Sequence, residues 1–104
     1  MELKVSSPGH KLSDEDIDAI QRDLQKIDRR LHNFDPVYAE VRISTSEGPP
    51  LFHVTVELEY GRNHLVAKAD NADMGQGVRH AREELLRQIN DRSRGSHSQY
   101  AKGR

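Results

Sequence analysis

The sequence predicts an α+β fold, a two-layer sandwich in which two helices cover one face of a four-stranded, mainly antiparallel sheet. Two long segments carry apolar residues at helical spacing, and four shorter ones alternate apolar and polar residues. Turn residues separate these segments in the order β-α-β-β-β-α. Two amphipathic helices over one half-apolar sheet is the layered arrangement that this pattern allows.

The first two elements are a short strand and a long amphipathic helix. Residues 1–5 alternate apolar and polar side chains, as a half-buried strand does. Ser13 is a good helix N-cap, and the three acids after it complement the positive end of the helix dipole. Asp35-Pro36 ends the helix, because a residue before proline avoids the α region. The apolar stripe between these signals consists of Ile17, Ile20, Leu24, Ile27, Leu31 and Phe34.

Three further strands are predicted over residues 37–43, 52–60 and 63–70, because apolar residues recur at every second position on one face of each. Gly61-Arg62 between the last two suits a two-residue type II′ turn with glycine at its first central position. This turn places every apolar pair on one side of the hairpin: Leu58 with Leu65, Val56 with Ala67, and Val54 with Ala69. The other side pairs Glu59 with His64 and His53 with Asp70, and we expect it to face solvent.

Asp73 caps the second predicted helix, whose apolar stripe is Met74, Val78, Ala81, Leu85 and Ile89. The periodicity stops at Asn90. We therefore expect a folded domain of residues 1–92 and a basic, disordered tail of residues 93–104. Residues 91–104 carry a local charge of +3 and the first ninety residues carry −4, although the whole chain has a net charge of only −1.

Length and composition exclude several classes of protein. A chain of 104 residues with 34% hydrophobic content forms one domain with a modest core. No apolar run approaches the roughly 18 residues of a membrane span, and no apolar signal peptide follows Met1, so we expect a cytoplasmic protein without membrane contact. The absence of cysteine excludes disulfides, thiolate metal sites and cysteine nucleophiles.

The sequence offers no catalytic, metal or cofactor site. The serines lack a GxSxG turn, and no glycine-rich phosphate loop is present. We therefore expect no enzyme activity and no cofactor. The histidines show no metal-ligand spacing, and each lies on a different element or loop: His10, His32, His53, His64, His80 and His97.

Basic residues on the two helices form a candidate RNA-binding surface. If the helices lie side by side, their outer faces merge into one basic face. The alternative is an ordinary solvated surface with i,i+4 pairs such as Asp18–Arg22 and Glu83–Arg87. Only Tyr38 is predicted to point away from the core within a strand, so no aromatic platform for single strands is expected. The candidate RNA-binding residues are Arg22, Lys26, Arg29, Arg30, Arg79, Arg82 and Arg87.

Four segments carry a resemblance to a known family. They are MELKV (1–5), LQKID (24–28), LVAKADNADM (65–74) and LLRQI (85–89). Over residues 1–92 the chain resembles the short form of the ribosome hibernation-promoting factor and ribosome-associated inhibitor family, also called sigma-factor modulation proteins.

The resemblance implies a fold akin to the double-stranded-RNA-binding domain and a bacterial, cytoplasmic, non-enzymatic protein. The implied partner is the small ribosomal subunit with its rRNA, bound in the channel used by messenger and transfer RNA. Binding there inhibits translation in stationary phase or stress. Lys26 and Arg87 match a lysine and an arginine that are typical of the family, and Asp73 and Met74 match its helix start.

Three positions depart from the family pattern. Gly75 stands where the family usually has an aromatic residue, and Asp23 and Glu84 stand where it commonly has lysines. The two acids make the implied RNA surface more negative. The alternative function is therefore a protein-interaction module of the same fold, with weak or no RNA binding. Exposed strand edges also permit a weak dimer, so we expect a monomer or a weak dimer.

Overall fold

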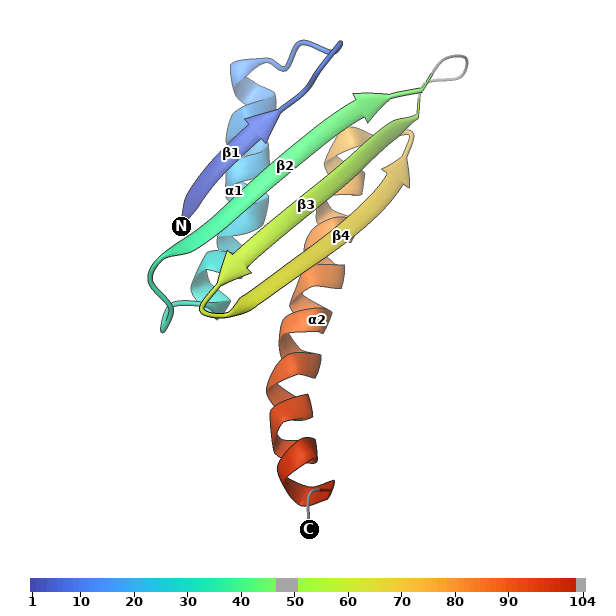
Figure 1. Cartoon of the computed structure of the whole chain (residues 1–104). Coiled ribbons are helices and arrows are strands. Elements are labelled where there is room, and N and C mark those ends of the chain that lie inside the picture. The colour runs from blue at the N-terminus through green and yellow to red at the C-terminus, as the bar shows by residue number, and fades with distance from the viewer. Residues whose placement is uncertain (47–50, 103–104) are drawn as a thin grey trace.

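One sheet and two helices form the two layers of this protein (Figure 1). The computed structural model describes the backbone of residues 1–46 and 51–102, and the side chains of residues 1–46 and 51–93. The elements are β1 (Glu2–Ser6), α1 (Asp14–Arg30), β2 (Val37–Thr45), β3 (Phe52–Tyr60), β4 (Asn63–Asn71) and α2 (Met74–Lys102). The order is β-α-β-β-β-α, as the sequence predicts.

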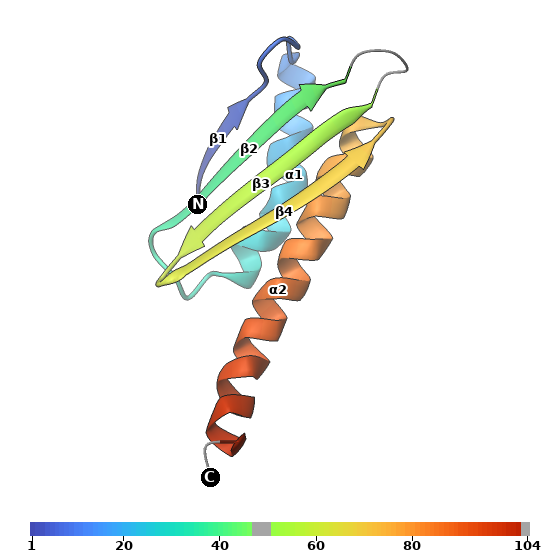
Figure 2. The same ribbon diagram turned by 45° about the vertical axis from the view of Figure 1, so that its right-hand side comes forward.

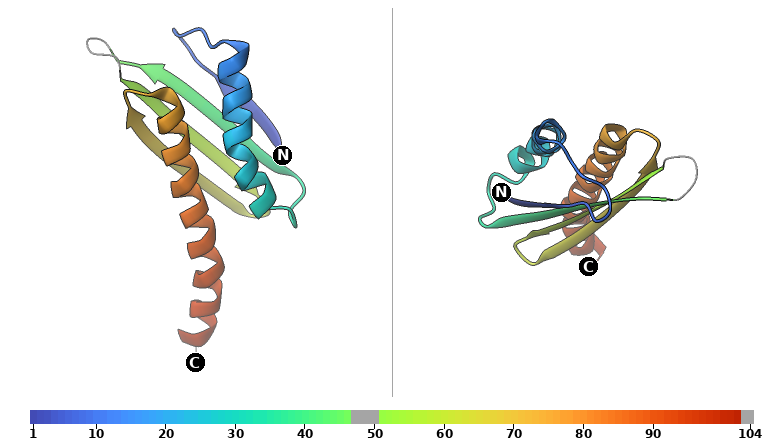
Figure 3. Two further views of the ribbon diagram at one scale, coloured as in Figure 1. Left: turned by 180° about the vertical axis from the view of Figure 1, so that it is seen from behind. Right: turned by 90° about the horizontal axis from the view of Figure 1, so that it is seen from above.

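The four strands lie in the sheet in chain order. β1 pairs with β2 in parallel, whereas β2 with β3 and β3 with β4 pair antiparallel. Both helices cover the same face of this sheet, and the other face is open (Figure 3). The predicted fold class, a mainly antiparallel sheet under two helices, is confirmed.

The core lies between the sheet and the helices, and it is apolar throughout the described residues. Leu24 and Ile27 of α1 and Leu85 of α2 are fully buried against β-strand residues such as Val41 and Val56. Each such side chain stabilises the fold by roughly 1.5–3 kcal/mol relative to an exposed position. The period-2 and helical patterns of the sequence therefore correspond to one shared apolar layer.

The β3–β4 hairpin has the predicted register. Gly61 has φ = 56° and Arg62 does not have a positive φ, which fits a type II′ turn. The apolar pairs are Leu58↔Leu65, Val56↔Ala67 and Val54↔Ala69. On the open face, His53 Nδ1 lies 2.7 Å from Asp70 Oδ1, as expected from that register. His64 faces Glu59 across the ladder, but its Nε2 contacts Glu57 Oε2 at 3.0 Å.

Helix α1 begins at a capping box and ends earlier than its apolar stripe predicts. Ser13 Oγ accepts a hydrogen bond from the Asp16 backbone N–H at 3.0 Å, and Asp16 Oδ2 accepts one from the Ser13 N–H. The helix ends at Arg30, so the prediction that Phe34 belongs to it was wrong. The Phe34 N–H closes a turn by donating to the Leu31 carbonyl, because the chain must reverse before β2 starts at Val37.

Helix α2 is longer than the sequence pattern predicts. Its backbone is helical to Lys102, whereas we expected a disordered segment from residue 93, and its last turns project beyond the sheet (Figure 2). Residues 91–102 contain no proline, so nothing in them breaks the helix. The apolar periodicity stops earlier because these turns lie beyond the sheet (Figure 2) and have no apolar surface to cover. The division at residue 92 stays a prediction. No helix in the described part of the chain is long and apolar enough to span a bilayer.

Gly61→Ala should lower the free energy of unfolding by about 1–2 kcal/mol, because a positive φ strains an L-residue. The added Cβ would also lie 3.3 Å from Phe34 Cε1. Urea denaturation measures the change. Arg62→Ala at the neighbouring turn position is the control and should change stability by less than about 0.5 kcal/mol. Equal effects of the two substitutions would contradict the turn assignment.

Candidate nucleic-acid interface

Three of the predicted basic residues form one exposed row on the outer face of α1. Arg22, Lys26 and Arg29 follow one another at spacings of four and three, opposite the buried Leu24 and Ile27. Within the part of the chain that the structure describes, no hydrogen bond or ion pair involves their side chains. We refer to these three residues as the α1 row. It offers three charges to solvent.

Two other predicted residues, Arg79 and Arg82 of α2, contact Asp23 of α1 across the two helices. Asp23 of α1 lies between them: its Oδ2 is 3.5 Å from Arg79 Nη1 and its Oδ1 is 3.8 Å from Arg82 Nη1. Arg82 Nη1 also donates to the Asp23 carbonyl oxygen at 3.3 Å. The side chains of Asp23 and Arg82 are only 19% and 12% exposed. These contacts, which we call the interhelical clamp, neutralise charge that the sequence assigns to RNA binding.

Arg30 also lies between the helices. Its Nε donates to Asn90 Oδ1 of α2 at 3.2 Å. Its side chain therefore faces the seam between α1 and α2, whereas the α1 row faces solvent.

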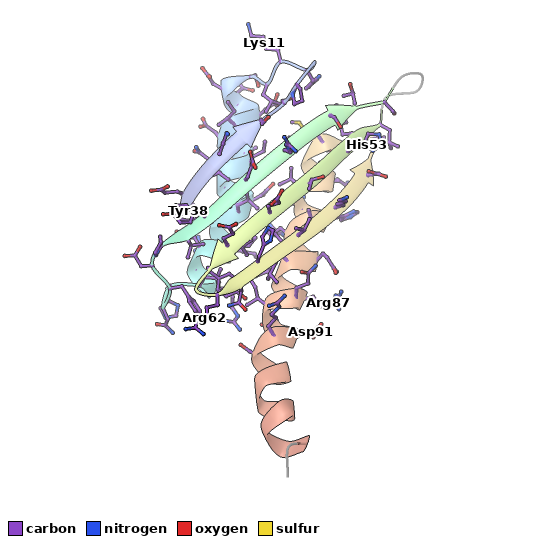
Figure 4. All side chains as sticks on the ribbon, in the orientation of Figure 1. Lys11, Tyr38, His53, Arg62, Arg87 and Asp91 are labelled. Atoms are coloured by element: carbon purple, nitrogen blue, oxygen red, sulfur yellow. The ribbon has the colours of Figure 1, made fainter. Side chains whose placement is uncertain are left out.

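Arg87 lies on the other side of α2, near β4 (Figure 4). Its Nε donates to Glu84 Oε2 at 3.0 Å, Nη2 contacts the other Glu84 oxygen, and Nη1 donates to Asp91 Oδ2 at 3.0 Å. Gln88 in the same cluster donates to the Val66 carbonyl of β4 at 3.0 Å, which places the cluster along that edge. Two carboxylates thus surround the guanidinium of Arg87.

The two i,i+4 pairs expected from the sequence do not form. Glu83 pairs with its neighbour Arg82 at 2.8 Å, and Arg87 pairs with Glu84 at i,i+3 and Asp91 at i,i+4. Among the described contacts, none joins Asp18 to Arg22. The Glu84–Arg87 pair can be predicted from the sequence, because the two residues are three apart on one helix. The Asp23–Arg79 pair cannot, because it forms only when the two helices pack together.

The predicted residues therefore do not merge into one basic face. The α1 row is open, Arg30, Arg79 and Arg82 are in the seam, and Arg87 is beside β4. Their assignment to RNA binding stays a prediction.

The open face of the sheet has a different character. A shallow depression of about 380 Å³ is lined by Glu2, Lys4, Tyr38, Glu40, Glu57 and Glu59. Tyr38 is 44% exposed there, as the sequence predicts (Figure 4). Carboxylates outnumber cations in this lining, which repels a polyanion. Among the described residues, no three side chains of the metal-ligating types lie close enough to hold an ion. The α1 row is thus the surface better suited to phosphate.

Arg87→Gln should raise the pKa of Glu84 toward its ordinary value. The hydrogen bond from Arg87 lowers this pKa most and that from Gln88 lowers it further, against a smaller opposing effect of desolvation. A ¹³C NMR titration of the carboxyl group measures the change, and Gln88→Ala should give a smaller rise.

The sign of the stability effect follows from the lowered pKa. The Glu84–Arg87 pair stabilises the fold above the ordinary pKa of a glutamate, and this contribution is lost as the pH falls through the lowered value. An unchanged Glu84 titration in Arg87→Gln would show that the pair does not persist in solution.

Comparison with known proteins by sequence gives no match to a family model or to a curated protein. The solved structures that match the fold include the following two. The N-terminal domain of Protein Y from Thermus thermophilus is 17% identical, with a TM-score of 0.76 over 86% of this chain and 96% of that chain. A ribosomal subunit interface protein from Coxiella burnetii is 14% identical, with a TM-score of 0.78 over 89% and 98%. The chain therefore has the fold of these two proteins, as the sequence resemblance implied.

Proposed function

We propose that this protein is a non-enzymatic, ribosome-associated translation inhibitor that binds the small subunit and its rRNA in the messenger and transfer RNA channel. The observation that carries the proposal is the α1 row, Arg22, Lys26 and Arg29, on a fold shared with a ribosomal subunit interface protein. A ribosome partner also implies a cytoplasmic protein.

The chemistry of the α1 row suits the phosphate backbone of folded RNA. Exposed guanidinium and ammonium groups displace counterions from phosphates, and this supplies affinity that falls with salt. Such contacts carry no base information, so the site of binding would be selected by the shape of the RNA. The acidic open face of the sheet, with Glu40, Glu57 and Glu59, would orient the protein with its helices toward the RNA.

A second candidate function is a protein-interaction module with weak or no RNA binding. The interhelical clamp and the Glu84–Arg87 pair favour it, because they neutralise Arg79, Arg82 and Arg87 within the molecule. The charge of −4 over the first ninety residues also favours it. The two candidates differ in whether the α1 row alone is sufficient for binding.

Reversing the α1 row (Arg22→Glu, Lys26→Glu and Arg29→Glu) should weaken ribosome binding by more than about tenfold and flatten its salt dependence. Co-sedimentation with small subunits and whole ribosomes at two salt concentrations measures both effects. The matched control reverses three cations of the open sheet face, Lys4, Arg42 and Lys68, with the same change in net charge. The control should bind like the unaltered protein.

If both triple variants lose the same amount of ribosome binding, the loss comes from the change in net charge. This result would contradict the assignment of the α1 row as the binding site. Absence of binding by the unaltered protein at low salt would favour the protein-interaction module. Arg87→Glu alone should weaken ribosome binding less than Lys26→Glu alone, because Glu84 and Asp91 already neutralise the charge of Arg87.

Asp23→Asn should strengthen ribosome binding, because it removes the carboxylate charge that lies between Arg79 and Arg82. Each additional phosphate that the protein neutralises steepens the log–log salt slope by about 0.9. Glu59→Gln removes one negative charge from the open sheet face and should leave the slope unchanged. Circular dichroism checks that both variants are folded. An unchanged slope in Asp23→Asn would show that the two arginines do not reach RNA.

A further inference from the structure

A hollow of about 170 Å³ lies where the C-terminal end of α1, the start of β4 and α2 meet. It lies beside the seam and is separate from the α1 row. Figure 1 shows the end of α1 and the β3–β4 turn at this same end of the molecule. The side chains that matter in its lining are Arg30, Phe34, Tyr60, Asn63, Arg92 and Ser93.

The phenol of Tyr60 is the most unusual group in the hollow. The residue is only 4% exposed, and its hydroxyl has no hydrogen-bond partner among the described residues. Burial raises the pKa of Tyr60, and the nearby positive charges of Arg92 and Arg30 oppose that rise. The phenol thus stays protonated at neutral pH, close to two guanidinium groups that line the same hollow. Its O–H donor is therefore available to an acceptor that enters from solution.

The polar side chains that line the hollow are neutral or positively charged, so the hollow suits an anionic ligand. Arg30 uses its Nε for Asn90, and its terminal nitrogens have no partner in the described part of the chain. Arg92 Nη1 donates to Asn63 Oδ1 at 3.2 Å, which holds the second guanidinium at the hollow. No carboxylate belongs to the described lining. Two cations and two hydroxyl groups, those of Tyr60 and Ser93, match the charge and the acceptors of a phosphate group.

Phe34 adds an aromatic surface at the rim. Phe34 is 40% exposed as a residue, and its ring packs edge-on against Tyr60, with 4.9 Å between ring centroids. Gly61 brings the backbone close to the ring, since a Cβ there would lie 3.3 Å from Phe34 Cε1. A ring held in this way can stack with a nucleobase. The hollow is too small for a whole nucleotide, so the base would remain outside, on Phe34.

We propose that this hollow binds the phosphate group of a nucleotide through Arg30, Arg92 and the Tyr60 hydroxyl, with the base stacked on Phe34. The nucleotide is either a free mononucleotide or part of an RNA strand. The inference goes beyond the proposed function, since it concerns a site apart from the α1 row. It stands or falls independently of ribosome binding.

An NMR titration of the whole protein with adenosine monophosphate, adenosine, inorganic phosphate and a short single-stranded RNA tests the proposal. Adenosine monophosphate should shift the backbone amide signals of Tyr60 and Asn63. Inorganic phosphate should bind the same place more weakly, and adenosine should not bind. If Tyr60 and Asn63 respond to the RNA but not to adenosine monophosphate, the ligand is a nucleotide within an RNA strand. If they respond to adenosine monophosphate, the hollow also binds a free nucleotide.

Three variants and one control define the site. Arg30→Gln should weaken binding by about tenfold and Tyr60→Phe by about threefold. Phe34→Ala should weaken binding of the nucleotide without changing that of inorganic phosphate. Arg42→Gln on the open sheet face removes one positive charge away from both the hollow and the α1 row, and this variant should bind like the unaltered protein.

Three results would overturn the proposal. They are equal binding of adenosine and adenosine monophosphate, equal effects of Arg30→Gln and Arg42→Gln, and no response of Tyr60 to either the nucleotide or the RNA. Tyr60→Phe keeps the buried ring, so a loss of binding in this variant cannot come from a loss of the fold.

Discussion

The architecture depends on one constraint: the sheet has a single apolar face. Both helices must cover that face to bury their stripes, so they lie next to each other and form a seam. Polar side chains that flank the stripes then meet across it, as Asp23 meets Arg79 and Arg82. The opposite sheet face is left to solvent and carries the acidic residues around Tyr38. One packing requirement thus separates the α1 row from an acidic sheet surface.

Arginines occur both in the seam between the helices and on the exposed surface of α1, but they make different contacts in the two places. Arg22 and Arg82 are both helix arginines near the candidate interface, but Arg82 is largely buried beside a carboxylate and Arg22 faces water. A partly buried arginine needs its counter-charge, because an unpaired charge away from water is costly. An exposed one gains little from any single intramolecular partner. This difference decides which cations are open to a polyanion.

The fold could be predicted from local rules, and the interface only in part. Alternation and the Gly61 turn determine strand register, since a shift by one residue would bury charges. The end of α1 was misplaced because Phe34 continues the helical spacing while packing on Tyr60 from a turn. The clamp at Asp23 joins residues far apart in the chain, and no spacing rule predicts it. The hollow around Tyr60 was missed for the same reason, since helical spacing places Phe34 in the apolar stripe.

The clamp also bears on selectivity. Asp23 is tethered beside Arg79 and Arg82, so its local concentration there far exceeds that of any dissolved anion. An isolated phosphate arriving from solution competes poorly with such a neighbour. A rigid surface that presents several phosphates at once, and that the α1 row would hold under the proposed function, would compete on equal terms because its groups are tethered too. Under the proposed function, the carboxylate of Asp23 would keep Arg79 and Arg82 from single phosphates and leave them responsive to densely folded RNA.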